Sequence, residues 1–443
     1  MKADGGSAPA VSVPGLTESR GLAYDRVGSG GVFAVRRAAP PRTHRARLAL
    51  LHAPRAPSPS PPAPSPLSSR IDVVPAVSVA LSAEVQLSAS PGTAPPLKIY
   101  SLRNSNGVEL RSMNYGATIL GLRLPDRKGA FEDVVLGLSA PEQYCSEAYA
   151  SEAPYFGAVI GRYCNRIENG RFDLDGQTHQ LTKSHGPHHL HGGAVGFDKR
   201  LWDAHPFEDG RAAIRYTYVS PAGEEGYPGR LTTAVTYHLR DDNALAVHYE
   251  ARTTAPTPVN LTQHTYFNLA GPAADDVLDH RLTIKADHFT PIDSALLPTG
   301  EIRPVDGTPF DFRHPTPIGA RIDADAPQLR RAQGYDHNFV RARCDDEGAR
   351  PGLAAQVYDP HSGRELTVYT TEPGVQLYTA NALSGTFTGK NGAPYGPHAG
   401  VCLETQHFPN APNEPAFPST ILRPGDTYRS TTIYAFDTRA PAS

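Results

Sequence analysis

Short segments in which apolar and polar residues alternate, separated by turn signals, run through the sequence from Leu97 onward and constrain its fold most. In the stretch 97–129, Asn-Gly at 106–107 and Lys-Gly at 128–129 stand where tight hairpins would join neighbouring strands. Further alternating stretches follow it, whereas helical periodicity is scarce. The sequence therefore predicts an all-β protein, an antiparallel β-sandwich or barrel of many strands.

The first 95 residues differ in composition from the rest. They hold ten Lys or Arg, five Asp or Glu and fourteen Pro, and include the run APSPSPPAPSP. Such sequence favours extended, solvated chain, so residues 1–95 are expected to be a mostly disordered extension and residues 96–443 the folded domain. A short strand within 73–88 is possible. The extension also resembles a transit peptide, but its acidic residues argue against that interpretation.

Charge, hydropathy and cysteine usage exclude several classes of protein. The formal net charge of −3 gives no basic surface for nucleic acid, and no apolar run reaches the length of a membrane span. The start of the chain lacks the pattern of a secretory signal. The four cysteines, Cys145, Cys164, Cys344 and Cys402, are far apart in sequence. They are expected to be thiols in a reducing compartment, which indicates a cytoplasmic location.

The stretch NLTQHTYFNL (260–269) alternates like a strand, yet one of its two faces is polar. Successive side chains of a strand point to opposite faces, so the even positions form one row. That row contains Asn260, Thr262, His264, Tyr266 and Asn268. It would suit the floor of a sugar-binding cleft, or it could simply face water.

Two later segments repeat this division of faces. In 400–410, Glu404 shares a face with Cys402 and Gln406 within an otherwise apolar run. In 373–381, Gln376 and Tyr378 lie opposite two apolar residues. A carboxylate in such a setting is either an exposed strand residue or an acid–base group held in a cleft.

The segment 161–193 is rich in histidine, arginine and asparagine. Its last four histidines are His185, His188, His189 and His191. Imidazoles bind zinc, but these have neither a helix to align them nor acidic or thiolate partners at set offsets, so no metal site is predicted. Arg166 beside Asn165 offers a forked donor next to an amide, suited to hydroxyl or carboxylate recognition or to a surface ion pair.

Taken together, eight segments resemble the aldose 1-epimerase family, and they occur in the family's order. They include NYGATILGLRLPDRKGAF, GRYCNRIENGRF, LHGGAVGFDKRLW, TPVNLTQHTYFNLAG, YDHNFV, TTEPGVQLYTAN and GVCLETQHFPNAPNEPAF. The resemblance covers about residues 97–440. It implies one large antiparallel β-sandwich with a small aldose bound in an open cleft, no cofactor, and a monomer or weak dimer.

The same resemblance implies roles for individual residues. His264 matches the general acid and Glu404 the general base. The substrate contacts would be Asn165, Arg166, His191, Asp336 and Gln376. A histidine acts more easily as an acid if a neighbour such as Asp336 or Glu404 favours the imidazolium.

The function expected on this basis is interconversion of the α- and β-anomers of hexoses such as D-galactose and D-glucose. Three alternatives stay open from the sequence: an epimerase of a phosphorylated or otherwise modified hexose, a carbohydrate-binding or sensor domain without catalysis, and a zinc-dependent β-fold enzyme.

Overall fold

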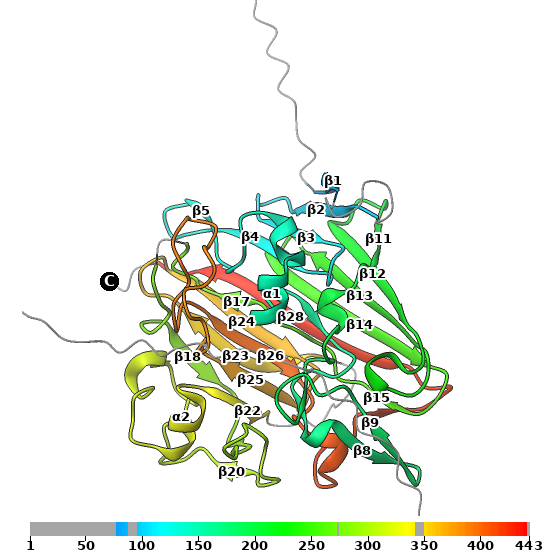
Figure 1. The fold of residues 1–443 in the computed structure, drawn as a ribbon. Coiled ribbons are helices and arrows are strands. Elements are labelled where there is room, and N and C mark those ends of the chain that lie inside the picture. The colour runs from blue at the N-terminus through cyan, green and yellow to red at the C-terminus, as the bar shows by residue number, and fades with distance from the viewer. Residues whose placement is uncertain (1–76, 87–94, 273, 342–349, 441–443) are drawn as a thin grey trace, which may run out of the picture. The chain divides into compact units, whose positions relative to one another are not determined.

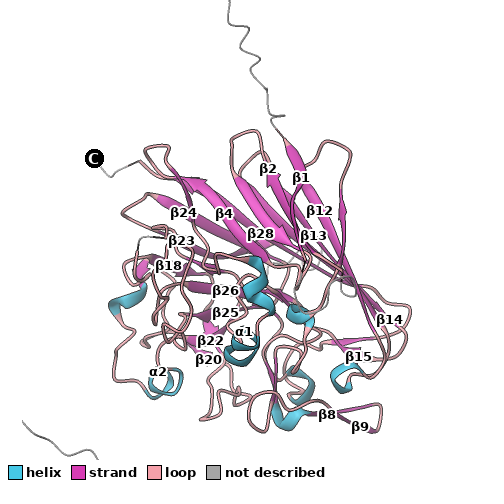
Figure 2. Cartoon of the chain, turned by 45° about the horizontal axis from the view of Figure 1, so that its top comes forward, coloured by secondary structure: helices cyan, strands magenta, loops and turns pink. Residues whose placement is uncertain are grey.

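Antiparallel strands make up most of the structure, a computed structural model that describes residues 77–86, 95–272, 274–341 and 350–440. These residues belong to the compact unit 71–443. Every strand pairing within its sheets is antiparallel, and Figure 2 shows how little helix lies among the strands. The all-β class and the sandwich expected from the family resemblance are therefore confirmed.

The largest sheet has nine strands, and its long members lie side by side in Figure 1. In spatial order they are β11 (Asp203–Pro206), β12 (Ala213–Ser220), β13 (Leu231–Leu239), β14 (Ala244–Thr253), β28 (Tyr428–Thr438), β24 (Arg364–Thr370), β23 (Gly352–Tyr358), β18 (Arg281–Ile284) and β21 (Thr316–Pro317). The C-terminal strand β28 lies between β14 and β24, so the sheet joins segments that are far apart in the sequence.

A six-stranded and a five-stranded sheet share a core with it. The six-stranded order is β17 (Tyr266–Phe267), β26 (Val401–Gln406), β25 (Gly374–Tyr378), β22 (Asp336–Val340), β19 (His288–Phe289) and β20 (Arg303–Pro304). The five-stranded sheet is a meander of β1 (Ser78–Val85), β2 (Leu97–Arg103), β3 (Glu109–Met113), β4 (Ile119–Pro125) and β5 (Phe131–Asp133).

One continuous apolar core joins the three sheets. Val235 of β13, Leu122 of β4 and Leu403 of β26 all belong to it, and each is almost fully buried. A hydroxyl contact of 2.6 Å between Thr405 of β26 and Thr432 of β28 also links the six-stranded to the nine-stranded sheet. Since side chains alternate along β26, its even-numbered residues must point away from this core.

Short ribbons and helices complete the described chain. The ribbons pair β6 (Val159–Ile160) with β16 (Thr262–Gln263), β7 (Arg166–Ile167) with β10 (His189–Leu190), β8 (Arg171–Leu174) with β9 (Gln177–Gln180), and β15 (Thr257–Pro258) with β27 (Ile421–Leu422). The α-helices are α1 (Glu147–Glu152) and α2 (Pro327–Ala332). Isolated single-turn 3₁₀ helices connect some of the strands.

Both expected hairpins form. Gly107 lies in the turn between β2 and β3 and Gly129 in the turn between β4 and β5. Each has a positive φ, of 81° and 83°, a backbone conformation that glycine adopts without a steric penalty.

The strand considered within 73–88 also forms, as β1. It pairs with β2 over Ser78–Val85, so the five-stranded sheet takes in residues on the N-terminal side of the expected boundary at 95. The remainder of the expected extension, residues 1–76 and 87–94, lies outside the described residues, and the domain division stays a prediction there.

Three of the four cysteines can be placed. Cys145, Cys164 and Cys402 are free thiols, whereas Cys344 lies outside the described residues. No helix in the described part of the chain is long and apolar enough to cross a membrane.

Candidate active site

A cleft of about 460 Å³ lies where the six-stranded sheet meets the loops that precede and follow the short ribbons. Its walls include six of the seven residues singled out from the sequence: Asn165, Arg166, His191, His264, Asp336 and Glu404. The seventh, Gln376, contacts one of them directly. The structure therefore brings together residues that are spread over 240 positions of the chain.

Strand register positions the residues from the six-stranded sheet. Gln376 of β25 stands opposite Glu404 of β26, and Asp336 of β22 stands opposite Tyr378 of β25. All four side chains lie on the face turned away from the shared core, as the alternation in the sequence predicts. Gln376 Nε2 donates a hydrogen bond of 2.6 Å to Asp336 Oδ1.

The polar row expected over 260–268 forms only in part. The segment is not one continuous strand, because β16 ends at Gln263 and β17 begins at Tyr266. Of the row, His264 and Tyr266 line the cleft.

The other three members of the row bond to the neighbouring segment 399–407. Asn260 Nδ2 donates to the carbonyl of residue 407, Thr262 Oγ1 to that of residue 405, and Asn268 Nδ2 to that of residue 399. The interpretation of the whole row as a cleft floor is thus wrong for these three. Buried polar side chains need partners, and here strand-edge carbonyls supply them.

His264 is held from several sides. Its backbone N–H donates to the carbonyl of Ala158 and its carbonyl accepts from Gly157, both at 2.9 Å. The imidazole lies between the rings of Tyr266 and Tyr155, with centroid distances of 5.0 Å and 5.7 Å and an angle of 29° to each. These contacts leave the ring little freedom to rotate.

The ribbon of β7 and β10, with the residues next to it, supplies the opposite wall. His191 and Asn165 both have positive φ, 50° and 61°, which non-glycine residues seldom adopt and which is common at functional sites. The backbone N–H of Asn165 donates to His191 Nδ1 at 3.2 Å. Arg166 Nη1 lies 3.9 Å from Asp336 Oδ2, so the arginine and the carboxylate face each other across the cleft.

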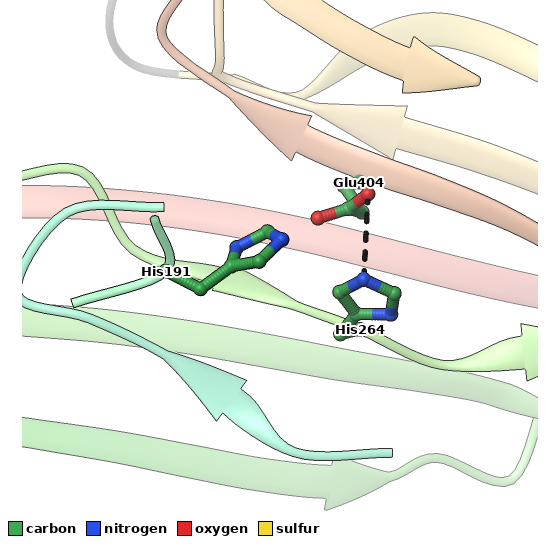
Figure 3. A group of neighbouring side chains, drawn as sticks. All are labelled: His191, His264 and Glu404. Atoms are coloured by element: carbon green, nitrogen blue, oxygen red, sulfur yellow. Dashed lines mark ion pairs between the residues drawn. The ribbon is translucent and has the colours of Figure 1, made fainter. Parts of the chain in front are cut away.

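The side chains of His264 and Glu404 point toward each other (Figure 3), and both residues line the cleft. His264 Nε2 lies 3.8 Å from Glu404 Oε1, too far for a hydrogen bond and close enough for both to reach one small molecule. Both side chains are at most 4% exposed.

Burial dominates the electrostatics of this pair. It lowers the pKa of His264 to about 4, and burial with the nearby Asp336 raises the pKa of Glu404 well above its usual value. Burial therefore outweighs any support that a neighbouring carboxylate gives to the imidazolium of His264. In a buried site the loss of hydration penalises either charge more than a partner at 3.8 Å compensates.

Several buried polar atoms in the cleft have no protein partner. They are Glu404 Oε2, Gln376 Oε1 and Arg166 Nε. Buried polar groups are nearly always hydrogen-bonded, so two acceptors and a donor left open in one place indicate a polar ligand. Polar hydroxyl groups, which both donate and accept, would satisfy them.

The residues that offer metal-ligating atoms close together are His191, His264 and Glu404, whose atoms lie within 4.8 Å of one another (Figure 3). The bond from Asn165 to His191 Nδ1 favours the neutral tautomer with its proton on Nε2, a donor rather than a ligand. Two other histidines of the segment 161–193 have other partners: His188 accepts from the backbone of Asn169, and His189 contacts Thr182 and Tyr227.

Sequence reasoning left aromatic residues of the cleft out of the candidate site. Tyr155 and Tyr378 line it together with Tyr266. The strand alternation does place Tyr378 on the face of Gln376. Tyr155 lies in a loop with φ of 57°, and no periodic signal marks it.

The fold and the cleft together define an all-β protein with a buried histidine–glutamate pair in a polar cleft. The family model described as aldose 1-epimerase matches residues 98–435. Galactose mutarotase from Sus scrofa is 45% identical over 360 residues, which cover 81% of this chain and 99% of that protein. The human protein of the same name is 47% identical over 324 residues, 73% of this chain and 90% of that protein.

A solved structure agrees with these relatives. The aldose epimerase homologue from C. elegans superimposes with a TM-score of 0.69 at 30% identity, covering 77% of this chain and 98% of the other. The chain belongs to the aldose 1-epimerase family, which confirms the resemblance found in its sequence.

Proposed function

We propose that the protein is a mutarotase that interconverts the α- and β-anomers of free hexoses such as D-galactose and D-glucose. The main support is the buried pair His264 and Glu404, whose Nε2 and Oε1 atoms lie 3.8 Å apart in a cleft with unpartnered polar atoms. Membership of the family supports the reaction, and the two curated relatives named galactose mutarotase support the sugar class.

Each half of the reaction transfers two protons. Glu404 removes the proton of the O1 hydroxyl, a carbonyl forms at C1, and the C1–O5 bond breaks as His264 delivers its Nε2 proton to O5. Rotation about the C1–C2 bond then presents the other face of the carbonyl to O5. Closure runs the transfers in reverse, so both residues regain their starting states. These steps need no metal, nucleotide or redox group.

The pair must hold one proton for this chemistry. Burial alone favours the proton on Glu404, because it raises the pKa of Glu404 and lowers that of His264. A sugar hydroxyl that donates to the carboxylate stabilises its charged form, and a ring oxygen that accepts from Nε2 favours the protonated imidazole. Substrate binding therefore moves the proton onto His264, where the ring opening requires it.

The remaining predicted residues would bind the sugar. Arg166 donates to hydroxyl oxygens, and Asp336 accepts from a hydroxyl while Gln376 fixes its orientation. His191 presents an Nε2–H donor, and Asn165 lines the same wall. The aromatic rings of Tyr155 and Tyr378 add apolar surface for the sugar face.

The decisive experiment is polarimetry on fresh α-D-galactose and α-D-glucose. Wild type is expected to reach the anomeric equilibrium rapidly, and His264→Asn and Glu404→Gln to lose at least about a hundredfold in kcat, since each removes one proton-transfer group. His185→Asn is the matched control, because His185 lines the same cleft outside the pair. All variants are checked for folding by circular dichroism.

If wild type matched buffer while still binding hexose, the mutarotase proposal would be abandoned in favour of a sugar sensor. The location in the cytoplasm and the monomeric or weakly dimeric state stay predictions. Gel filtration coupled to light scattering measures the second.

A further inference from the structure

The two nitrogens of the His264 ring face two side chains of a single strand. Nε2 lies 3.8 Å from Glu404 Oε1, and Nδ1 lies 3.6 Å from Cys402 Sγ. Both partners belong to β26 and are two positions apart, so they point to the same face. A carboxyl group and a thiol from one strand therefore lie beside the two nitrogens of the imidazole.

We propose that Cys402 is a positioning residue that holds the proton of neutral His264 on Nδ1 and so leaves Nε2, the nitrogen that faces Glu404, able to take up the proton that it passes to O5. The inference deepens the proposed mutarotase function, because it explains how the acid is presented to the sugar. Cys402 does not touch the sugar in this scheme and acts through His264 alone.

The contact meets the geometric conditions for such a role. The distance of 3.6 Å is within hydrogen-bonding range for sulfur, and both residues are buried, at 0% and 3% exposure. The backbone of Cys402 is fixed between Tyr266 of β17 and Tyr378 of β25 in the strand register. The pairing of β26 with β17 and β25 therefore fixes the position of the Cys402 sulfur beside the imidazole ring.

The chemistry of a thiol suits a nitrogen that keeps its proton while Nε2 gains and loses one. The sulfur accepts a hydrogen bond from Nδ1–H in the neutral ring as well as in the protonated ring. Burial raises the pKa of Cys402 well above its ordinary value, so the group stays a neutral thiol.

The absence of charge on the Cys402 thiol has a second consequence. A carboxylate beside Nδ1 would stabilise the imidazolium and make His264 a weaker acid. The thiol lacks that charge, so the protonated ring keeps its tendency to release the Nε2 proton to O5. The two tyrosine rings that flank His264 fix the plane in which this proton points.

The direct test is nitrogen NMR of the full chain labelled with ¹⁵N-histidine, with the His264 signals assigned by their loss in His264→Asn. Wild type is expected to show the Nδ1–H tautomer at neutral pH. Cys402→Ala is expected to show a mixture of tautomers, and Cys402→Ser to restore the wild-type form because a hydroxyl also accepts. An unchanged tautomer in Cys402→Ala would overturn the inference.

Kinetics supply a second readout. Cys402→Ala should lower kcat about tenfold with KM within about twofold, because one hydrogen bond to the acid is lost while the sugar contacts remain. Cys402→Ser should recover most of that loss. Cys164→Ala is the matched control, since Cys164 is equally buried but its thiol contacts Gln406. An equal loss in the control would assign the effect to packing and overturn the inference.

The two proposals fail in different ways. If wild type lacked mutarotase activity but Cys402→Ala still changed the tautomer of His264, the mutarotase proposal would be rejected and the positioning role of Cys402 would be kept. If wild type were active and all Cys402 variants kept both the tautomer and kcat, the positioning role alone would fall. If Cys402→Ala did not fold, the tautomer of Cys402→Val would take its place in the same comparison.

Discussion

At the scale of single residues, the cleft contains buried side chains and backbone conformations that lower the stability of the folded protein. His264 and Glu404 are buried without a direct hydrogen bond between them, and Tyr155, Asn165 and His191 adopt left-handed backbone conformations. Such groups cost free energy in the folded state and persist only where the surroundings hold them in place. Their gathering in one cleft is the physical mark of a functional site.

Asp336 connects the proposed sugar-binding residues with the proposed acid–base pair. It accepts from Gln376, lies near Arg166 and contributes to the raised pKa of Glu404. Asp336→Asn is expected to raise KM about tenfold and to lower kcat, because an amide in this place loses the charge and sets an N–H₂ group against a donor. Polarimetry at varied galactose concentrations measures both constants.

The charge-matched control for this change is Asp279→Asn, because the side chain of Asp279 is 82% exposed and pairs with His361 outside the cleft. That variant should keep wild-type constants. Equal kinetics for Asp336→Asn and wild type would remove Asp336 from the site.

At the scale of elements, β26 organises the centre of the molecule. Its odd residues pack into the core against the nine-stranded sheet, and its even residues supply Cys402 and Glu404 to the cleft. Because side chains alternate strictly, a slip of one residue in its pairing with β25 would bury the carboxylate in the apolar core. The same strand thus fixes both the core and the acid–base geometry.

The turn that carries His191 depends on the glycine that follows it. Gly192 has a φ of +88°, and a Cβ there would lie 1.8 Å from the carbonyl oxygen of Gly161. Gly192→Ala is therefore expected to lower the free energy of unfolding by about 2 kcal/mol or more and to reduce kcat by displacing His191. Urea denaturation and polarimetry measure the two effects.

Gly186→Ala is the matched control. Gly186 also has a positive φ, of +58°, but a Cβ there would meet open space. Its cost should be about 1 kcal/mol, from backbone conformation alone. Equal losses in the two variants would show that the close approach to Gly161 is unimportant.

At the scale of the whole molecule, the described sheets enclose several neutral histidines. Burial lowers the pKa of His280 to about 4 and that of His337 to about 3, as it does for His264. His280 accepts from the backbone N–H of Leu269, and His337 accepts from that of Asp336. Protonation would therefore remove a hydrogen bond and also place a charge inside the protein.

These depressed values predict that acid weakens the fold well before the carboxylates titrate. A histidine with a folded-state pKa below its unfolded value of about 6.5 loses stability as pH falls through that range, at up to about 1.4 kcal/mol per pH unit. The free energy of unfolding is expected to be a few kcal/mol lower at pH 5 than at pH 7. Glu404 opposes this trend, because its raised pKa makes folding take up a proton.

Urea denaturation at the two pH values is the measurement. His280→Gln should reduce the difference between them, since the glutamine does not titrate. A free energy of unfolding that stays constant from pH 7 to pH 5 would contradict the assignment of these histidines as buried and neutral.

Alternation, turn chemistry and family motifs determined much of this protein from the sequence alone. They predicted the antiparallel β architecture, the hairpins at Gly107 and Gly129, and the faces of Glu404 and Gln376. These succeed because side-chain direction along a strand and backbone conformation in a turn depend on neighbouring residues only.

Only the tertiary structure decided which polar residues reach the cleft and how they titrate. Only part of the polar row 260–268 lines the cleft, because the strand is interrupted between β16 and β17. His264 therefore lies in the cleft, while Asn260 bonds to a neighbouring segment. The pKa order of His264 and Glu404 likewise follows from burial by several elements. Desolvation depends on everything that surrounds a group in space, and no local pattern in a sequence contains that information.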